Sequence, residues 1–225
     1  MTGHDRGARI CHRLAVDNGD GAGLQDFLIR GTILLDIVPT LTQWDTFKRS
    51  TSAVGHFHWP LLANVDFATE LIKAQGGDKF CRSLIDRWAG KTPEGLRSLK
   101  ENGALKVYGD FFAQASVIRA SCQDYRAGAE EDVEEQKLDQ NSRDARIGCP
   151  TLVIYSSEYL GSHYDVEKVW STWVRDTAKL RVAGIKGSGH FIAEEAPVPT
   201  AALINDFWLE NARSSLTPQQ QDVRS

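Results

Sequence analysis

Apolar residues form short continuous runs near both ends of the chain and recur with helical spacing between them. The runs that predict buried parallel strands lie at 32–37, 149–155 and 180–183. Apolar positions three and four residues apart predict helices at about 8–16, 66–73, 79–88, 93–101, 105–117, 166–174 and 193–211. Strands that alternate with helices are typical of an α/β fold with a parallel sheet.

The pattern also divides the chain. From residue 44 to about 145 it is helical and free of strands, which is about the length of a small domain. We therefore expect a core built from 1–40 and 149–213, an inserted helical region at 41–148 and a disordered, Gln-containing tail at 214–225. Within the insertion, the charge-rich segment 130–146 predicts a solvated helix end and linker.

Composition narrows the choice of partners. The net charge is −4 and no Lys/Arg cluster is interleaved with aromatic residues, which argues against nucleic acid and anionic membranes and favours a small-molecule substrate. The four cysteines are far apart, and neither a secretory leader nor a transmembrane run is visible, so we expect reduced thiols and a cytoplasmic protein. The spacing of the histidines indicates no metal site.

The first seven residues carry a candidate reactive group. In Gly3-His4-Asp5-Arg6-Gly7 the glycines favour a tight strand-to-helix turn, where a Cβ on either side would clash, and the turn presents Asp5. An aspartate is ionised at neutral pH and can displace a leaving group from a saturated carbon. The alternative, which the motif alone favours, is an ordinary glycine turn with a helix-capping aspartate.

The following helix would place Ile10, Cys11, Leu14 and Ala15 toward the core and Arg6, Arg9 and Arg13 on another face. Cations on the first turn of a helix oppose the helix dipole unless they bind an anion. Arg6 and Arg9 are therefore candidates to hold a substrate carboxylate.

Two further groups complete a pattern. Asp36 ends the second predicted strand, and His190 lies in a glycine-flanked loop before the last helix. The chain order of Asp5, Asp36 and His190 is nucleophile, acid and histidine, which is the order of an α/β-hydrolase triad. Glu158, after the strand at 149–155, is a second candidate for the acid.

Five segments resemble the fluoroacetate (haloacetate) dehalogenase branch of the α/β-hydrolase superfamily, close to the epoxide hydrolases: GHDRGARICHRLA, LLDIVPT, FHWPLLA, DYRAGA and GHFIAEEAP. The resemblance implies a core sheet with a helical cap between its sixth and seventh strands, and no cofactor. It implies that Asp5 is the nucleophile, that Asp36 and His190 complete the triad, and that Arg6 and Arg9 bind the carboxylate of a 2-haloacid. It further implies that a leaving halide is bound by His58, Trp59 and Tyr125.

The chain also departs from that family. There the turn follows the fifth strand, so we expect an N-terminally truncated, partial fold that holds the C-terminal half of the sheet and lacks one oxyanion-hole loop. The strand that ends in Asp36 would then have an unpaired edge, through which a homodimer or another association could form, and the Met1 amino group would lie free of the sheet. The stretch Gly21–Arg30 is an insertion that can move Asp36 out of register with His190.

Two classes of function remain open. The chain is either a hydrolase, in which Asp5 displaces halide and His190 activates water to cleave the ester, or a truncated, non-catalytic relative. An epoxide hydrolase is the second enzymatic reading, although it needs cap phenols and the expected cap holds only Tyr108 and Tyr125.

Overall fold

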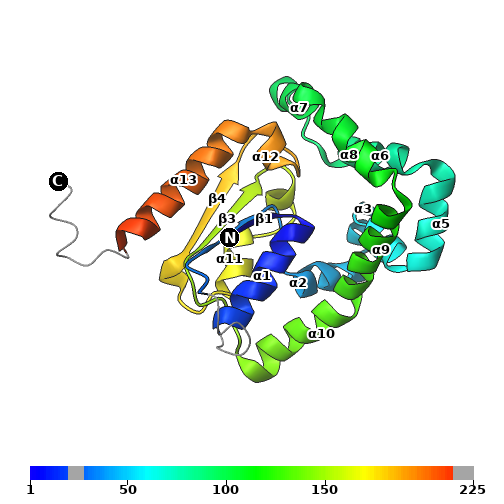
Figure 1. Cartoon of the computed structure of the whole chain (residues 1–225). Helices are drawn as coiled ribbons and strands as arrows, with labels where there is room; N and C mark the ends of the chain where they lie inside the picture. Colours follow the sequence, from blue (N-terminus) through cyan, green and yellow to red (C-terminus); the bar gives the residue numbers. More distant parts are fainter. Residues whose placement is uncertain (20–27, 215–225) are drawn as a thin grey trace. The chain divides into compact units, whose positions relative to one another are not determined.

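The computed structural model describes residues 1–19 and 28–214, and the chain divides into two compact units (Figure 1). The first unit comprises 1–37, 90–95 and the chain from 145 onward, and the second comprises 38–89 and 96–144. The expected tail at 214–225 lies outside the described residues except for Ser214, as does most of the stretch 21–30.

The first unit is an α/β structure with four described strands, all parallel, in the order β1-β2-β3-β4. The strands are β1 (Thr2–His4), β2 (Thr32–Leu35), β3 (Thr151–Ser156) and β4 (Leu180–Ile185). The predicted α/β class and three of the strands are confirmed. The fourth, β1, was missed because three residues are too few to show an alternating pattern.

Pairing of β1 with β2 corrects two expectations. Gly3 lies opposite Leu34, so β2 has a strand on each side and its expected free edge does not exist. The Met1 amino group does not lie free of the sheet, because it donates to the Gly31 carbonyl at 2.9 Å. The Met1 carbonyl in turn accepts from the Ile33 N–H at 2.9 Å.

Residues of the strands alternate between the two faces of the sheet, as parallel strands require. One face packs against α12 (Ile192–Glu195) and α13 (Pro197–Ser214), and its core contains Ile33, Leu35, Leu152, Ile154, Ile185, Ile192 and Phe207. On the other face α1 (Arg6–Gly19) packs against β1 and β2. The sheet thus lies between helical layers (Figure 1).

The inner side of α1 differs in part from the expected one. Cys11 and Ala15 are buried as predicted, but Ile10 is 59% exposed and Arg9 is only 8% exposed. The side that turns inward is therefore the one that carries Arg9 and His12, rather than the side of Ile10.

His12 is a fully buried polar residue in this packing. Its ring is buried, with Trp170 of α11 (Val166–Ser171) and Trp173 each at 5.0 Å between ring centroids and nearly perpendicular to it. Burial, followed by the charges of Arg13 and Arg9, lowers the pKa of His12 to about 3. The imidazole is therefore neutral when the chain is folded at neutral pH.

Proline and loop residues break two of the predicted helices. The last helix is interrupted at Ala196, because Pro197 has no N–H to continue the helix and restricts the residue before it. The helix predicted at 105–117 is divided into α8 (Ala104–Phe112) and α9 (Ala115–Ala129).

The second unit is helical and contains no strand. Its other α-helices are α2 (Thr40–Asp45), α3 (Ser50–Gly55), α4 (His58–Ala63), α5 (Val65–Gln75), α6 (Gly77–Trp88) and α10 (Glu131–Leu138), while α7 (Pro93–Lys100) begins in the first unit. Its core contains Trp59, Leu62, Val65, Ala68, Ile72, Phe80, Ile118, Cys122 and Tyr125.

The segment 130–146 is not the solvated linker expected from its charge. It forms α10 and a π-helical turn (Asp139–Arg143), and it buries Val133, Gln136 and Asp139. The Gln136 side chain accepts the Leu41 N–H at 2.8 Å and so ties α10 to the start of the unit. One side of α10 is therefore packed, although most residues of the segment are charged.

Among the described residues no helix is long and apolar enough to cross a membrane. Within the same ranges no group of His, Cys, Asp or Glu side chains is arranged to hold a metal ion.

The turn after β1 predicts different outcomes at its two glycines. A Cβ on Gly3 would lie 2.5 Å from the Gly7 carbonyl oxygen and 2.6 Å from the Ala8 nitrogen, both backbone atoms that cannot yield locally. Gly3→Ala should therefore reduce the free energy of unfolding in urea by about 1–3 kcal/mol.

Gly7→Ala is the matched control, since a Cβ there meets nothing within 4 Å, contrary to the expected clash on both sides. In the first turn of α1 it should leave stability unchanged or raise it by roughly 0.5–1 kcal/mol. Equal destabilisation by both variants would contradict this account of the turn.

Candidate active site

Asp5 occupies a sharp turn between β1 and α1. Its φ is +47°, a left-handed conformation that a non-glycine residue adopts only when its surroundings hold it. They do so here, because the Asp5 N–H donates to the Leu35 carbonyl at 3.2 Å and the Asp5 carbonyl accepts from the Ala8 N–H at 2.9 Å. The side chain stands above the sheet edge and is 36% exposed.

Asp36 follows β2 directly and, like Asp5, adopts a positive φ that is held by a hydrogen bond from its backbone N–H. Its φ is +50°, and its N–H donates to the Ile154 carbonyl at 2.8 Å. The carboxylate is fully buried; Oδ2 lies 2.7 Å from His190 Nδ1, and Oδ1 accepts the Ser156 N–H at 2.8 Å. The stretch 21–30 therefore does not move Asp36 out of register with His190, contrary to the expectation.

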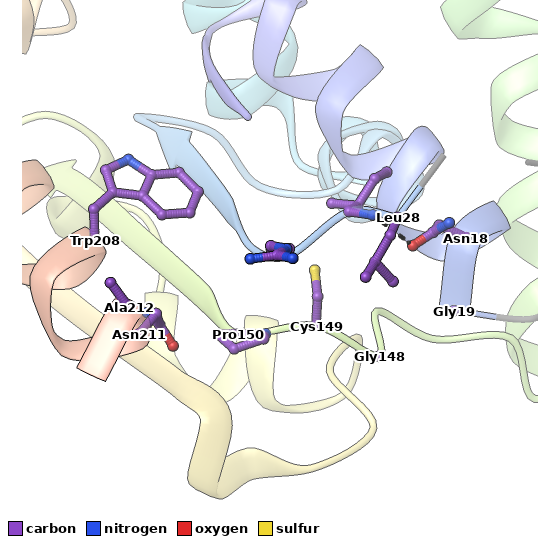
Figure 2. A pocket seen from close by; sticks show the side chains of 11 residues that line it. Asn18, Gly19, Leu28, Gly148, Cys149, Pro150, Trp208, Asn211 and Ala212 are labelled. Carbon is purple, nitrogen blue, oxygen red and sulfur yellow. Dashed lines mark hydrogen bonds between the residues drawn. The ribbon is translucent and has the colours of Figure 1, made fainter. Parts of the chain in front are cut away.

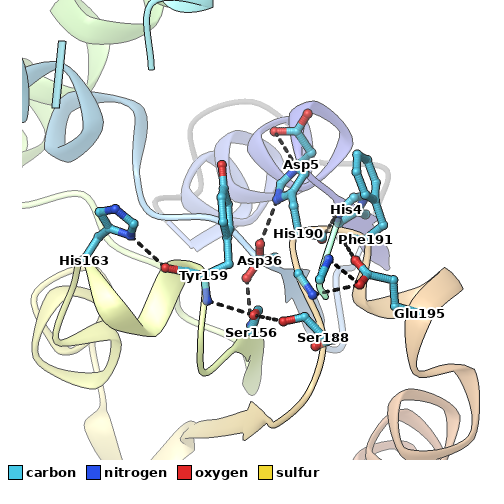
Figure 3. A network of polar contacts seen from close by, with 12 residues as sticks. His4, Asp5, Asp36, Ser156, Tyr159, His163, Ser188, His190, Phe191 and Glu195 are labelled. Atoms are coloured by element: carbon cyan, nitrogen blue, oxygen red, sulfur yellow. Dashed lines mark hydrogen bonds and ion pairs between the residues drawn. The ribbon is translucent and has the colours of Figure 1, made fainter. Parts of the chain in front are cut away.

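His190 lies on the loop between β4 and α12, with its ring between the two carboxylates (Figure 3). Its Nδ1 faces Asp36, while Nε2 lies 3.8 Å from Asp5 Oδ1. The ring is only 11% exposed. The structure thus brings together Asp5, Asp36 and His190, which are far apart in the sequence.

The two carboxylates govern the charge of the imidazole. Burial acts to lower the pKa of His190, but the hydrogen bond that its ring donates to Asp36 and then the interactions with Asp5 raise it to about 10. Burial likewise acts to raise the pKa of Asp5, but His190 above all, then His4 and Arg9, hold it well below its usual range. At neutral pH the arrangement is an imidazolium between two carboxylates.

His4 is part of the site, although no sequence motif predicted a role for it. Its Nε2 donates to the His190 carbonyl at 2.8 Å, and the two rings are 4.7 Å apart between centroids. Burial, and then the charge of His190, lower the pKa of His4, so the ring is neutral and can act as that donor. The only sequence signal for His4 is its position beside Asp5.

Two backbone-binding residues were also missed. Ser156 is fully buried; its N–H donates to Asp36, and its hydroxyl donates to the Ser188 carbonyl. Glu195 is 6% exposed and accepts N–H groups on both sides of His190. Neither could be found by charge or motif, because a serine after a strand and a glutamate in a helix are ordinary.

Arg6 and Arg9 both lie in the first turn of α1, next to Asp5. Arg9 is buried in α1, where its charge contributes to the lowered pKa of Asp5, and Arg6 is the first residue of α1 and is partly buried. Glu158 is exposed and accepts the Gly187 N–H at 3.0 Å. It is not the acid partner of His190, because Asp36 occupies Nδ1.

The three residues that resemble a halide site lie in the second unit and form one aromatic cluster there. His58 and Trp59 begin α4, Tyr125 lies in α9, and all three are buried. The Tyr125 ring lies 5.7 Å from each of the other two rings, nearly perpendicular to both. Trp88 joins them, with its ring 4.4 Å from that of His58.

A separate hollow of about 790 Å³ opens at the opposite edge of the sheet, where β2 and β3 begin (Figure 2). Its lining includes Arg30, Cys149, Pro150 and Trp208. None of the three triad candidates lies there.

The chain is similar to known proteins in both sequence and structure. The sequence is 30% identical over 217 residues to the fluoroacetate dehalogenase of a Burkholderia species, in an alignment that covers 96% of this chain and 65% of that protein. The crystal structure of a candidate α/β hydrolase from Nostoc sp. PCC 7120 matches 92% of this chain at 34% identity, with a TM-score of 0.78. The chain has an α/β-hydrolase fold. No family model matches the sequence.

A second solved structure is also similar to this chain. The structure of a candidate epoxide hydrolase from Pseudomonas aeruginosa matches 94% of the chain at 27% identity, with a TM-score of 0.79. In each of these comparisons the chain spans 65% of the relative's length.

The charge arrangement predicts how His190 titrates. In Asp5→Asn the imidazolium loses one of its carboxylates, and its pKa should fall by roughly 1–3 pH units. Asparagine tolerates a positive φ, so the turn is retained. The measurement is an NMR titration of the His190 ring, and an unchanged pKa would contradict the proposed coupling.

The raised pKa of His190 also predicts how the free energy of unfolding changes with pH. Because the folded pKa of His190 is raised above the unfolded value of 6.5, its stabilising contribution is complete below pH 6.5 and is lost as the pH rises through about 10. The difference in unfolding free energy between the native chain and Asp5→Asn should shrink over that interval.

Proposed function

We propose that the chain is a hydrolase of the dehalogenase type, which displaces halide from a 2-haloacid and hydrolyses the resulting ester. The observation that carries the proposal is the imidazole of His190, held at Nδ1 by Asp36 and directed at Nε2 toward Asp5. This is the geometry of a nucleophile, a base and the group that orients the base.

In the first step a carboxylate oxygen of Asp5 attacks the α-carbon of the haloacid. A carbon–oxygen bond forms, the carbon–halogen bond breaks, and the halide leaves with the electron pair. The lowered pKa keeps Asp5 ionised, so no base is needed at this stage. Arg6 and Arg9, in the first turn of α1 after Asp5, are assigned to the substrate carboxylate, which guanidinium groups bind with two parallel hydrogen bonds.

Ester formation then changes the protonation of His190. Once Asp5 is esterified it is neutral, and the interactions by which it raises the pKa of His190 are lost. The imidazole can release its proton and then accept one from water at Nε2. The hydroxide adds to the ester carbonyl carbon, the bond from that carbon to the alkoxide oxygen breaks, and the proton on Nε2 passes to the departing hydroxyacid. The carboxyl proton of the regenerated Asp5 then passes to Nε2, which restores the imidazolium beside a carboxylate. The first step thus prepares the base for the second.

The aromatic cluster of the second unit is assigned to the leaving halide. Indole and imidazole N–H groups and a phenol O–H are the donors that a halide in an apolar site requires. His58, Trp59 and Tyr125 supply one of each from a single buried cluster. The backbone N–H of Arg6 lies in the first turn of α1 and is assigned to the oxyanion, because first-turn N–H groups have no acceptor within the helix.

The test is halide release by the purified chain from fluoroacetate or chloroacetate. Asp5→Asn should abolish release, because an amide is not a nucleophile at saturated carbon. His190→Ala should release no more than one halide per chain and retain a carboxymethyl ester on Asp5, which mass spectrometry of the peptide would locate.

Asp206→Asn is the matched control, since it removes an exposed carboxylate of α13 and should retain full turnover. Turnover of epoxides without any halide release would replace the proposed substrate class by that of an epoxide hydrolase. Absence of turnover on both, with no ester in His190→Ala, would refute the enzymatic proposal for this chain.

A further inference from the structure

A buried carboxylate outside the triad contacts the loop that carries His190. Glu195 is 6% exposed and accepts three backbone N–H groups. We propose that Glu195 and Gly90 form a clasp that positions His190 for the hydrolytic step. This inference rests on the proposed function and extends it to a residue that does not touch the reacting atoms.

The hydrogen bonds of Glu195 are placed on both sides of His190. Its Oε2 accepts from Gly189 at 2.9 Å, and its Oε1 accepts from Phe191 at 3.0 Å (Figure 3). The residues before and after His190 are therefore fixed to one carboxylate. Since the His190 backbone cannot shift without breaking one of these bonds, the carboxylate sets where Nδ1 meets Asp36.

The third bond extends the clasp to a distant part of the chain. Oε2 of Glu195 also accepts the Gly90 N–H at 2.7 Å, and the hydroxyl of Thr92 donates to the Gly187 carbonyl at 2.7 Å. Residues 90–95 belong to the first unit although the residues on either side of them in the sequence belong to the second. Two bonds thus bind this short passage to the His190 loop.

Only glycine fits at position 90. A Cβ there would lie 2.6 Å from Glu195 Oε2 and 2.6 Å from the Gly189 nitrogen. The close approach of three chain segments is therefore built around this residue, and the short distance to the Gly189 backbone adds a steric requirement to the hydrogen bonds.

The loop needs such a constraint. It contains Gly187, at a φ of +76°, and Gly189, and glycines lose more conformational entropy on folding than other residues. Hydrogen bonds to a charged acceptor are about twice as strong as neutral ones, so one buried carboxylate with three donors can hold a loop that its own sequence leaves flexible.

Glu195→Gln is the first test, because it keeps the shape of the side chain and replaces one acceptor oxygen by an NH₂ donor. At least one of the three N–H groups then loses its acceptor. Amide exchange at Gly90, Gly189 or Phe191 should accelerate by about tenfold or more, since a bond to a charged group is lost. In turnover with fluoroacetate, ester formation should continue while hydrolysis slows, so that esterified Asp5 accumulates.

Glu167→Gln is the control for the loss of a charge. Glu167 is an exposed glutamate of α11 in the same unit, and its substitution should change neither amide exchange in the loop nor the level of ester.

Gly90→Ala disturbs the clasp at Gly90 while leaving Glu195 unchanged. It therefore separates loss of the clasp from any effect of the new glutamine side chain. It should accelerate exchange at Gly189 and Phe191 although Glu195 is intact. Gly55→Ala, where a Cβ meets nothing within 4 Å, is its control and should leave both amides unchanged.

The outcomes separate this inference from the function on which it rests. Unchanged exchange at Gly189 and Phe191 in both Glu195→Gln and Gly90→Ala would overturn the clasp, whatever the activity. If the native chain turns over fluoroacetate, faster amide exchange in Glu195→Gln without accumulation of esterified Asp5 would overturn the role of the clasp in hydrolysis. If the native chain shows no turnover, the proposed function fails, and the exchange measurements still decide whether the clasp exists.

Discussion

The parallel pairing of β1 with β2 is the constraint on which the candidate site depends. It places the carboxyl ends of the two strands side by side. The residues that follow them, Asp5 and Asp36, therefore lie at the same edge of the sheet. Both residues adopt a positive φ, and in each the backbone N–H is held by the carbonyl of the neighbouring strand. The hydrogen bonds of the sheet therefore maintain the unfavourable conformation that presents each carboxylate.

Given two carboxylates at one edge, the position of a single imidazole decides what they can do. Asp36 is fully buried and has both oxygens engaged, by His190 and by Ser156, so it can orient the ring but not react. Asp5 is partly exposed and makes the longer contact, which leaves room for substrate at its oxygens. Two residues of the same type thus receive different roles from their burial and their hydrogen bonds.

Much of the site could be predicted because its signals are local. Asp5 and His190 stand among glycines, Asp36 ends an apolar run, and their order along the chain matches that of a known triad. The parts that escaped prediction depend on contacts between distant segments. A strand as short as β1 has no periodicity, Gly90 is recognisable only from what approaches it, and the inner side of α1 was set by the tryptophans that pack on His12 rather than by Ile10.

The neutral His12 on the buried side of α1 has a consequence for acid sensitivity. Its pKa is about 3 in the folded chain and near 6.5 when unfolded, so the unfolded chain binds the extra proton in mildly acidic solution and folding becomes less favourable there. Asp5 remains ionised over the same range. Acidification would accordingly weaken the packing of α1 before it neutralised the Asp5 carboxylate, so that the packing around His12, rather than the charge of Asp5, would set the lower pH limit of the folded site.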